Sequence, residues 1–377
     1  MQLLRDVYKM DRKPWPAHPQ PLSDEVFSSW MTRAARCNGR KLSGFVLQTC
    51  PQIKAFTKHI DSSIKMEALK DVAGYMHTPL ELAWNTTLGS YAGWLFESAE
   101  HKCNLLRAGE TRHHLLFQQY CPVCLREGIP YYRKSWRISF VTVCYQHQCR
   151  LLDCCHKCGA PVMVNANDSK DKFKVYNGEF SACHSCGNDL RTAPCSRAKK
   201  GVLSATKVFL DTLDKGYVSL DGRHWVYSFS YFIVIKHLMR LLIERHQETR
   251  NHGVLNDVDC LPIDARYLAL AEIGNAFSSW PDLFLEFCRN KALNYSSMTS
   301  MEKTNNGNVP YWFSKAVKPQ LYRPNIEPSN QSVICAIKVM RARRIKISIS
   351  RVNRFMGYKD SQAVKKITKE YWSSYAK

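Results

Sequence analysis

The sequence predicts a mainly α-helical protein with small β zinc ribbons in its middle. Apolar residues recur at helical spacing near both ends of the chain, whereas cysteine pairs of the form C-x2-C gather between them. The length of 377 residues suggests about two to three domains. We divide the chain into an N-terminal helical domain resembling a helix-turn-helix (1–110), tandem zinc ribbons (111–197), a helical scaffold (198–309) and a basic C-terminal unit resembling a helix-turn-helix (310–377).

The composition is that of a folded protein in a reducing compartment. Hydrophobic residues make up 45% of the chain, which is enough for ordinary cores. The opening MQLLRDVYKMD lacks the apolar stretch of a secretion signal. The most apolar segment, residues 231–243, is shorter than the roughly 20 residues of a membrane span. We therefore expect a cytoplasmic protein without membrane contact.

The net charge of +22 is concentrated at the C-terminal end. Residues 310–377 contain fifteen Lys and Arg residues against Glu327, Asp360 and Glu370. Such a concentration of positive charge indicates contact with a polyanion. The alternative is a solvated face that only keeps the protein soluble.

The spacing of the first Cys and His pairs predicts a metal site. Cys121 and Cys124 form a C-x2-C knuckle, and nineteen residues later Cys144 and His147 form a C-x2-H knuckle. Each pair can present two ligands to one metal through a tight turn. Together they predict one tetrahedral zinc site.

A second set of ligands follows directly. Cys155 and Cys158 precede an excursion of 24 residues that ends at Cys183 and Cys186, and a glycine follows each of these two knuckles. Four protein ligands leave no open position on the ion. Both predicted zinc ions are therefore structural rather than catalytic.

Other interpretations of the cysteines stay open. Disulfides and a redox C-x2-C motif are disfavoured by the expected compartment and by the number of knuckles. Cys154 could replace Cys155, or Cys121 and Cys124 could share a metal with Cys155 and Cys158. We favour sequential pairing because each ribbon then closes locally. The scattered cysteines are expected to be small core residues: Cys37, Cys50, Cys103, Cys260, Cys288 and Cys335.

The N-terminal domain is predicted to be a compact set of helices. The first helix is expected to be capped by Ser23 or Asp24 and to stop at Asn38-Gly39. Its apolar stripe comprises Val26, Phe27, Trp30, Met31 and Ala34. Later helices are expected within 42–50, 62–76 and 78–89, the last capped by Thr78. The last two have the outline of a helix-turn-helix, for which packing is favoured over DNA reading.

The C-terminal unit is predicted to contain three helices in a helix-turn-helix pattern. They are expected at about 332–344, at about 350–356 before a turn at Gly357, and after a start at Asp360 or Ser361. The alternative is a basic helical cap that only closes the fold. The candidate nucleic-acid contacts are Arg341, Arg343, Arg344, Arg351, Lys359, Ser361, Gln362, Lys365, Lys366 and Lys369.

The remaining segments suggest scaffolding rather than catalysis. Residues 201–309 are predicted to be largely helical, and residues 311–330, with three prolines, to form an extended linker. The chain has no phosphate loop, dinucleotide fingerprint or common hydrolase motif. We therefore expect no enzymatic activity. A two-metal nuclease is the alternative, since its carboxylates need not share a motif.

Several of these stretches together resemble a known family. The helix motif of residues 21–39, the block 120–159 with its Tyr-Cys-Pro start and central Trp136, and the second ribbon closing at Cys186 resemble the TniQ family. This family of transposon target-selection proteins includes TnsD. The resemblance covers roughly residues 14–190.

The resemblance implies a non-catalytic adaptor for DNA transposition in the bacterial nucleoid. Such an adaptor marks a target and brings in an AAA+ ATPase regulator, which engages the transposase. Short family members dock as homodimers on a CRISPR Cascade complex with its guide RNA, and the length of this chain places it nearer that class. Longer, TnsD-like members read target DNA directly, and the basic C-terminal unit keeps that alternative open. A zinc-containing transcriptional regulator is a further alternative.

The ligand spacing predicts two zinc ions per chain. Elemental analysis of the purified protein should give about two equivalents, because two complete four-ligand sets are present. A stoichiometry near zero or one would contradict the two-site interpretation.

Overall fold

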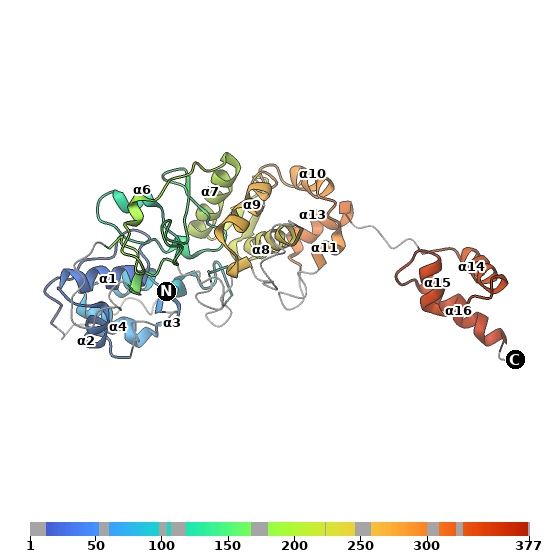
Figure 1. The fold of residues 1–377 in the computed structure, drawn as a ribbon, viewed down its shortest axis with the longest axis horizontal. Coiled ribbons are helices and arrows are strands. Elements are labelled where there is room, and N and C mark those ends of the chain that lie inside the picture. Colours follow the sequence, from blue (N-terminus) through green and yellow to red (C-terminus); the bar gives the residue numbers. More distant parts are fainter. Residues whose placement is uncertain are drawn as a thin grey trace. The chain divides into compact units, whose positions relative to one another are not determined.

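The computed structural model in Figure 1 divides the chain into two compact units, Met1–Leu321 and Tyr322–Lys377, called unit 1 and unit 2 below. In the described residues, no helix is both long and apolar enough to cross a membrane. The structure describes residues 13–52, 60–97, 104–106, 118–166, 180–222, 224–245, 258–299, 309–321 and 327–375.

Unit 1 begins with a bundle of short helices around a separate hydrophobic core. Trp30 and Met31 of the first helix and Phe45 of the second are completely buried there. The predicted apolar stripe of the first helix is therefore its packing face. The elements are α1 (Phe27–Cys37), α2 (Leu42–Thr49), α3 (Ile60–Ser63), α4 (Met66–Tyr75), α5 (Leu80–Asn85) and the 3-10 helix η1 (Leu88–Tyr91).

Two predicted helix caps in this bundle are wrong. The N-cap residue of α1 is Val26, and Asp24 instead accepts hydrogen bonds from the amide and hydroxyl of Ser135. The N-cap residue of α5 is Pro79, and the Thr78 hydroxyl bonds away from the helix. Both polar side chains serve contacts distant in sequence, which local cap rules do not consider.

The described part of the Cys-rich region, residues 118–198, has little regular secondary structure. Two short strands in it pair antiparallel, with Cys144 opposite Cys149. Its described elements are α6 (Pro122–Arg126), η2 (Ser135–Arg137), β1 (Val143–Cys144), β2 (Cys149–Arg150), η3 (Val164–Ala166) and η4 (Leu190–Thr192).

A buried ion pair joins the helical bundle to the Cys-rich region. Arg137 Nη1 lies 2.7 Å from Asp61 Oδ2, and both side chains are less than a tenth exposed. Asp61 also accepts hydrogen bonds from the amide and hydroxyl of Ser28 at the start of α1. The carboxylate therefore connects α1, α3 and η2.

The helical scaffold packs on the other side of the Cys-rich region through Arg266. This fully buried guanidinium donates hydrogen bonds to the carbonyl oxygens of Leu261 and Ser139 and to Gln119 Oε1. Residues 225–227, expected to be helical, instead form a strand. The elements are α7 (Lys200–Lys215), β3 (Tyr217–Ser219), β4 (Trp225–Tyr227), α8 (Ser228–Arg245), η6 (Val258–Cys260), α9 (Ile263–Ile273), α10 (Asp282–Asn290), α11 (Tyr295–Thr299) and α13 (Tyr311–Leu321).

The expected extended linker is wrong over its first half. Residues 311–321 form α13, which buries Phe313, Val317 and Leu321 against unit 1. These three residues recur every four positions, so they lie on one helical face. The sequence prediction missed this periodicity because Pro319, near the end of the helix, pointed to an extended linker. The division between the units consequently falls after Leu321 rather than at residue 310.

Unit 2 has the three helices that the sequence predicts. They are α14 (Asn330–Ala342), α15 (Ile349–Phe355) and α16 (Gln362–Tyr375), and Gly357 has the positive φ of +80° that the turn requires. Ser329 and Ser348 cap the first two helices through their hydroxyls. The core comprises Val333, Ile337, Met340, Ile347, Val352, Val364 and Ile367.

The Asp61–Arg137 pair should be important for the stability of unit 1. Asp61→Asn should lower the free energy of unfolding by about 3–5 kcal/mol, because it leaves the Arg137 charge buried without its partner. The matched control is Asp211→Asn, which breaks the exposed Lys207–Asp211 pair and should cost about 0–1 kcal/mol. Denaturant unfolding of both variants tests this, and equal losses would contradict the assignment.

Candidate metal centres and a basic C-terminal unit

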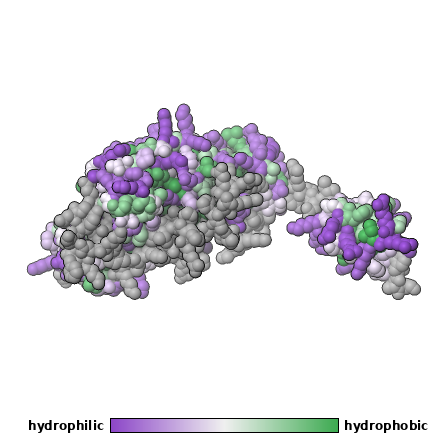
Figure 2. Space-filling model, in the orientation of Figure 1, coloured by the Kyte–Doolittle hydropathy of each residue, from purple (hydrophilic) through white to green (hydrophobic). Residues whose placement is uncertain are grey.

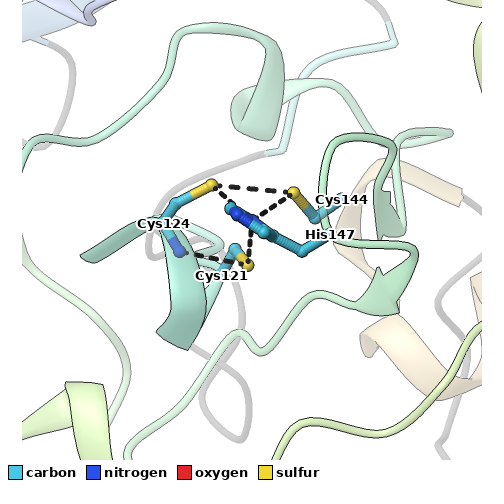
Figure 3. Close-up of side chains that lie close together, drawn as sticks. All are labelled: Cys121, Cys124, Cys144 and His147. Atoms are coloured by element: carbon cyan, nitrogen blue, oxygen red, sulfur yellow. Dashed lines mark hydrogen bonds between the residues drawn. The ribbon is translucent and has the colours of Figure 1, made fainter. Parts of the chain in front are cut away.

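Cluster 1 consists of Cys121, Cys124, Cys144 and His147, whose ligand atoms all lie within 4.8 Å of one another. Cys121 precedes α6 and Cys124 lies within it, while Cys144 ends β1 and His147 follows in the turn before β2. Figure 3 shows the four side chains converging on one point. The two knuckles therefore present their ligands from opposite sides.

The spacing within cluster 1 fits a tetrahedral ion. The sulfurs of Cys124 and Cys144 are 3.6 Å apart, and His147 Nδ1 lies 3.2 to 3.5 Å from the three sulfurs. A tetrahedral zinc ion with Zn–S bonds of about 2.3 Å separates its sulfurs by about 3.8 Å. The side chains thus stand at positions suited to a shared metal.

A carboxylate that the sequence analysis missed completes cluster 1. Glu127 Oε2 lies 2.8 Å from His147 Nε2, on the ring edge opposite the cluster. A carboxylate there holds the proton on Nε2 and leaves Nδ1 as the metal-binding nitrogen. Only the fold brings Glu127, just after α6, to a histidine twenty residues later.

The charge balance of cluster 1 also favours a cation. Hydrogen bonds from the Cys124 and Cys144 thiols lower the pKa of Cys121 far below its usual value. The hydrogen bond to Cys121 in turn raises the pKa of Cys144 to about 11. Without a cation the cluster therefore ionises only in part, because nearby thiolates repel one another. A divalent ion relieves this repulsion, so metal binding releases protons and weakens as the pH falls.

Cluster 2 consists of Cys155, Cys158, Cys183 and Cys186. The sulfurs of Cys155 and Cys186 are 3.8 Å apart, and those of Cys158 and Cys183 are 3.7 Å apart. These distances also match the edges of a tetrahedral tetrathiolate site. The glycines after the knuckles, Gly159 and Gly187, have φ of +69° and +72°, as the tight turns require.

The structure brings together the eight predicted ligands in sequential pairs. Cys155 belongs to cluster 2, whereas Cys154 lies outside it and faces Pro161 across a β-bridge. Cys121 and Cys124 share their cluster with Cys144 and His147 rather than with the later knuckles. The interleaved arrangement is therefore absent from this structure.

The other cysteines only partly follow the expectation of core positions. Cys50, Cys260 and Cys288 are buried, but Cys37 and Cys335 are exposed. Cys103 lies outside the described residues. Cys37 is the last residue of α1 and follows the buried stretch, which ends at Ala35.

The basic residues of unit 2 are mostly exposed. Two predicted contacts are poorly placed for nucleic acid, because Ser361 is buried and Lys365 binds Asp360 at 2.7 Å. The Ser361 hydroxyl donates to Glu327 and accepts from the Val364 amide at the start of α16. The exposed predicted residues are Arg341, Arg343, Arg344, Arg351, Lys359, Gln362, Lys366 and Lys369.

The family comparison matches the first part of this architecture. The family model TniQ matches residues 16–151, from the start of the helical bundle through cluster 1 and β2. The match covers less than half of the chain, and we call residues 16–151 the TniQ region because they are similar to this family. The match supports a role associated with DNA transposition, in target selection or DNA binding. The search among curated proteins found no match to the chain.

The TniQ region ends before cluster 2. The matched residues stop at 151, whereas the first ligand of cluster 2 is Cys155. The resemblance expected from the sequence reached about residue 190, so the family match is shorter. The geometry of cluster 2 rests on this structure alone.

Neighbouring cysteines provide a test of the ligand assignment. Cys155→Ser should remove one equivalent of bound metal, because it leaves cluster 2 with three sulfurs. Cys154→Ser, the matched control one residue earlier, should keep the full metal content of the unmodified protein. Elemental analysis of both variants measures this, and metal loss in the Cys154 variant would contradict the assignment.

Proposed function

We propose that the protein is a non-catalytic target-selection adaptor for DNA transposition. It links the recognised target to an AAA+ ATPase regulator and, through this regulator, to the transposase. The TniQ region supports the transposition role. The two closed four-ligand clusters support a structural role for their metals, which we propose to be Zn²⁺, because no coordination position is left for a reacting water.

The adaptor contacts target DNA through unit 2, and the outer face of α16 is the observation that carries this proposal. Gln362, Lys366, Lys369 and Ser373 are all exposed and recur at helical spacing. The opposite side of α16 buries Val364 and Ile367 in the core of unit 2. A helix fixed in this way can present amide and ammonium groups to a DNA groove.

Two of the three acidic residues of unit 2 have hydrogen-bond or ion-pair partners within the unit. Glu327 accepts hydrogen bonds from Ser361 and from the Ala363 amide, and Asp360 binds Lys365. Figure 2 shows hydrophilic residues over much of the visible described surface of unit 2.

The second candidate is docking on a CRISPR Cascade complex. Phe355 and Trp372 of unit 2 are 49% and 52% exposed. Exposed aromatic side chains of this size are frequent anchors in protein interfaces. In this alternative, unit 2 packs on the guide complex, and base pairing by the guide RNA recognises the target.

The outer face of α16 should determine the salt dependence of DNA binding. Lys366→Ala combined with Lys369→Ala should reduce the magnitude of the log-log salt slope on duplex DNA by up to about two units, since each phosphate contact contributes about 0.9. The control replaces Lys13 and Lys65, two exposed lysines of unit 1, and should leave the slope unchanged.

The same experiment separates the two candidates. If unit 2 docks on Cascade, the double variant keeps the salt slope of the unmodified protein and loses co-purification with the guide complex. That outcome would contradict direct DNA contact by α16.

A further inference from the structure

The two metal clusters differ in access to solvent. The three sulfurs of cluster 1 belong to residues that are at most 8% exposed, namely Cys121, Cys124 and Cys144. In cluster 2, Cys158 and Cys186 are exposed. Each of them is the second cysteine of its C-x2-C knuckle. Because both are exposed, a molecule in solution can reach cluster 2 through either side chain.

The clusters also differ in the contacts that hold their ligands. The Glu127 carboxylate fixes the His147 ring of cluster 1 through the 2.8 Å contact. Among the described residues, no carboxylate is hydrogen-bonded to a ligand of cluster 2. The Cys183 sulfur instead accepts the Ser185 amide at 3.4 Å. A carboxylate that is hydrogen-bonded to a metal-binding histidine, as Glu127 is to His147, changes metal affinity by about 10- to 100-fold.

The ligand sets favour different cations. Cluster 1 contains an imidazole, whereas cluster 2 offers four sulfurs. An all-thiolate set is the softer of the two and accepts soft cations such as Cd²⁺ or Cu⁺ alongside Zn²⁺. Cluster 2 therefore combines the softer donor set with the greater exposure.

We propose that cluster 2 is an exchangeable metal site, whereas cluster 1 retains its ion. Exchange starts when an incoming ligand reaches the ion through the open side at Cys158 or Cys186. Each metal–sulfur bond that breaks is replaced by a bond from the ion to the incoming ligand, and the freed thiolates take up protons from water. This inference is independent of the contact between unit 2 and DNA.

Metal exchange at cluster 2 should affect the TniQ region, because residues near cluster 2 pack against α1. Between the two knuckles of cluster 2, η3 packs against α1. Phe180, just before the second knuckle, lies under the Arg36 guanidinium of α1 at 5.1 Å. Loss of the cluster 2 ion therefore loosens a surface on which the first helix of the TniQ region rests.

The experiment uses the full zinc-loaded chain and a chromogenic chelator. Zinc should leave in two resolved phases of about one equivalent each, because an outer contact such as that at His147 changes metal affinity by about 10- to 100-fold. Cys158→Ser should abolish the fast phase, whereas Glu127→Gln should accelerate only the slow one. Cys37→Ser and Cys335→Ser, which change exposed cysteines outside both clusters, should leave both phases unchanged.

Two further measurements keep the proposal testable if a cysteine variant does not fold. Cd²⁺ added to the zinc-loaded protein should produce thiolate-to-cadmium charge-transfer absorption for one site before the other. After the fast phase, hydrogen exchange should rise in residues 155–166 and 180–190 while residues 118–150 stay protected. Release of both equivalents in one phase, or a fast phase that Cys158→Ser leaves intact, overturns the proposal.

Discussion

The architecture of unit 1 centres on its Cys-rich region, which contains both four-ligand clusters. The described part of that region has strands of only two residues and no helix longer than α6, which has five. Backbone pairing of this extent cannot fix a chain segment by itself. The two clusters join its four knuckles, and metal binding at such sites is coupled to folding. The buried side chains of this region also belong to the same hydrophobic core as those of the scaffold helices.

Buried charges connect this region to the helices around it. Asp61 and Arg137 link it to the bundle, and the Arg266 guanidinium links it to the scaffold. Both arginines have a depressed pKa because burial disfavours their charge. Such groups persist only when partners satisfy them, so these contacts restrict how the three parts of unit 1 can pack.

Unit 2 is organised differently from unit 1, because its hydrophobic core is formed by its own three helices. Its fold does not rely on the clusters. In the proposed adaptor, the two units therefore have different roles. Unit 1 contains the metal clusters, and unit 2 contacts nucleic acid.

The sequence by itself determined the ligands and most of the helices. Knuckle spacing is a local property, so the eight cluster residues could be named without a structure, and apolar periodicity identified the helices of unit 2. Tertiary structure decided what depends on distant contacts. Asp24 binds Ser135 instead of capping α1, α13 forms because unit 1 buries one of its faces, and Glu127 reaches His147 only after folding. The choice between Cys154 and Cys155 was likewise decided by backbone direction at the knuckle, which adjacent cysteines in a sequence do not reveal.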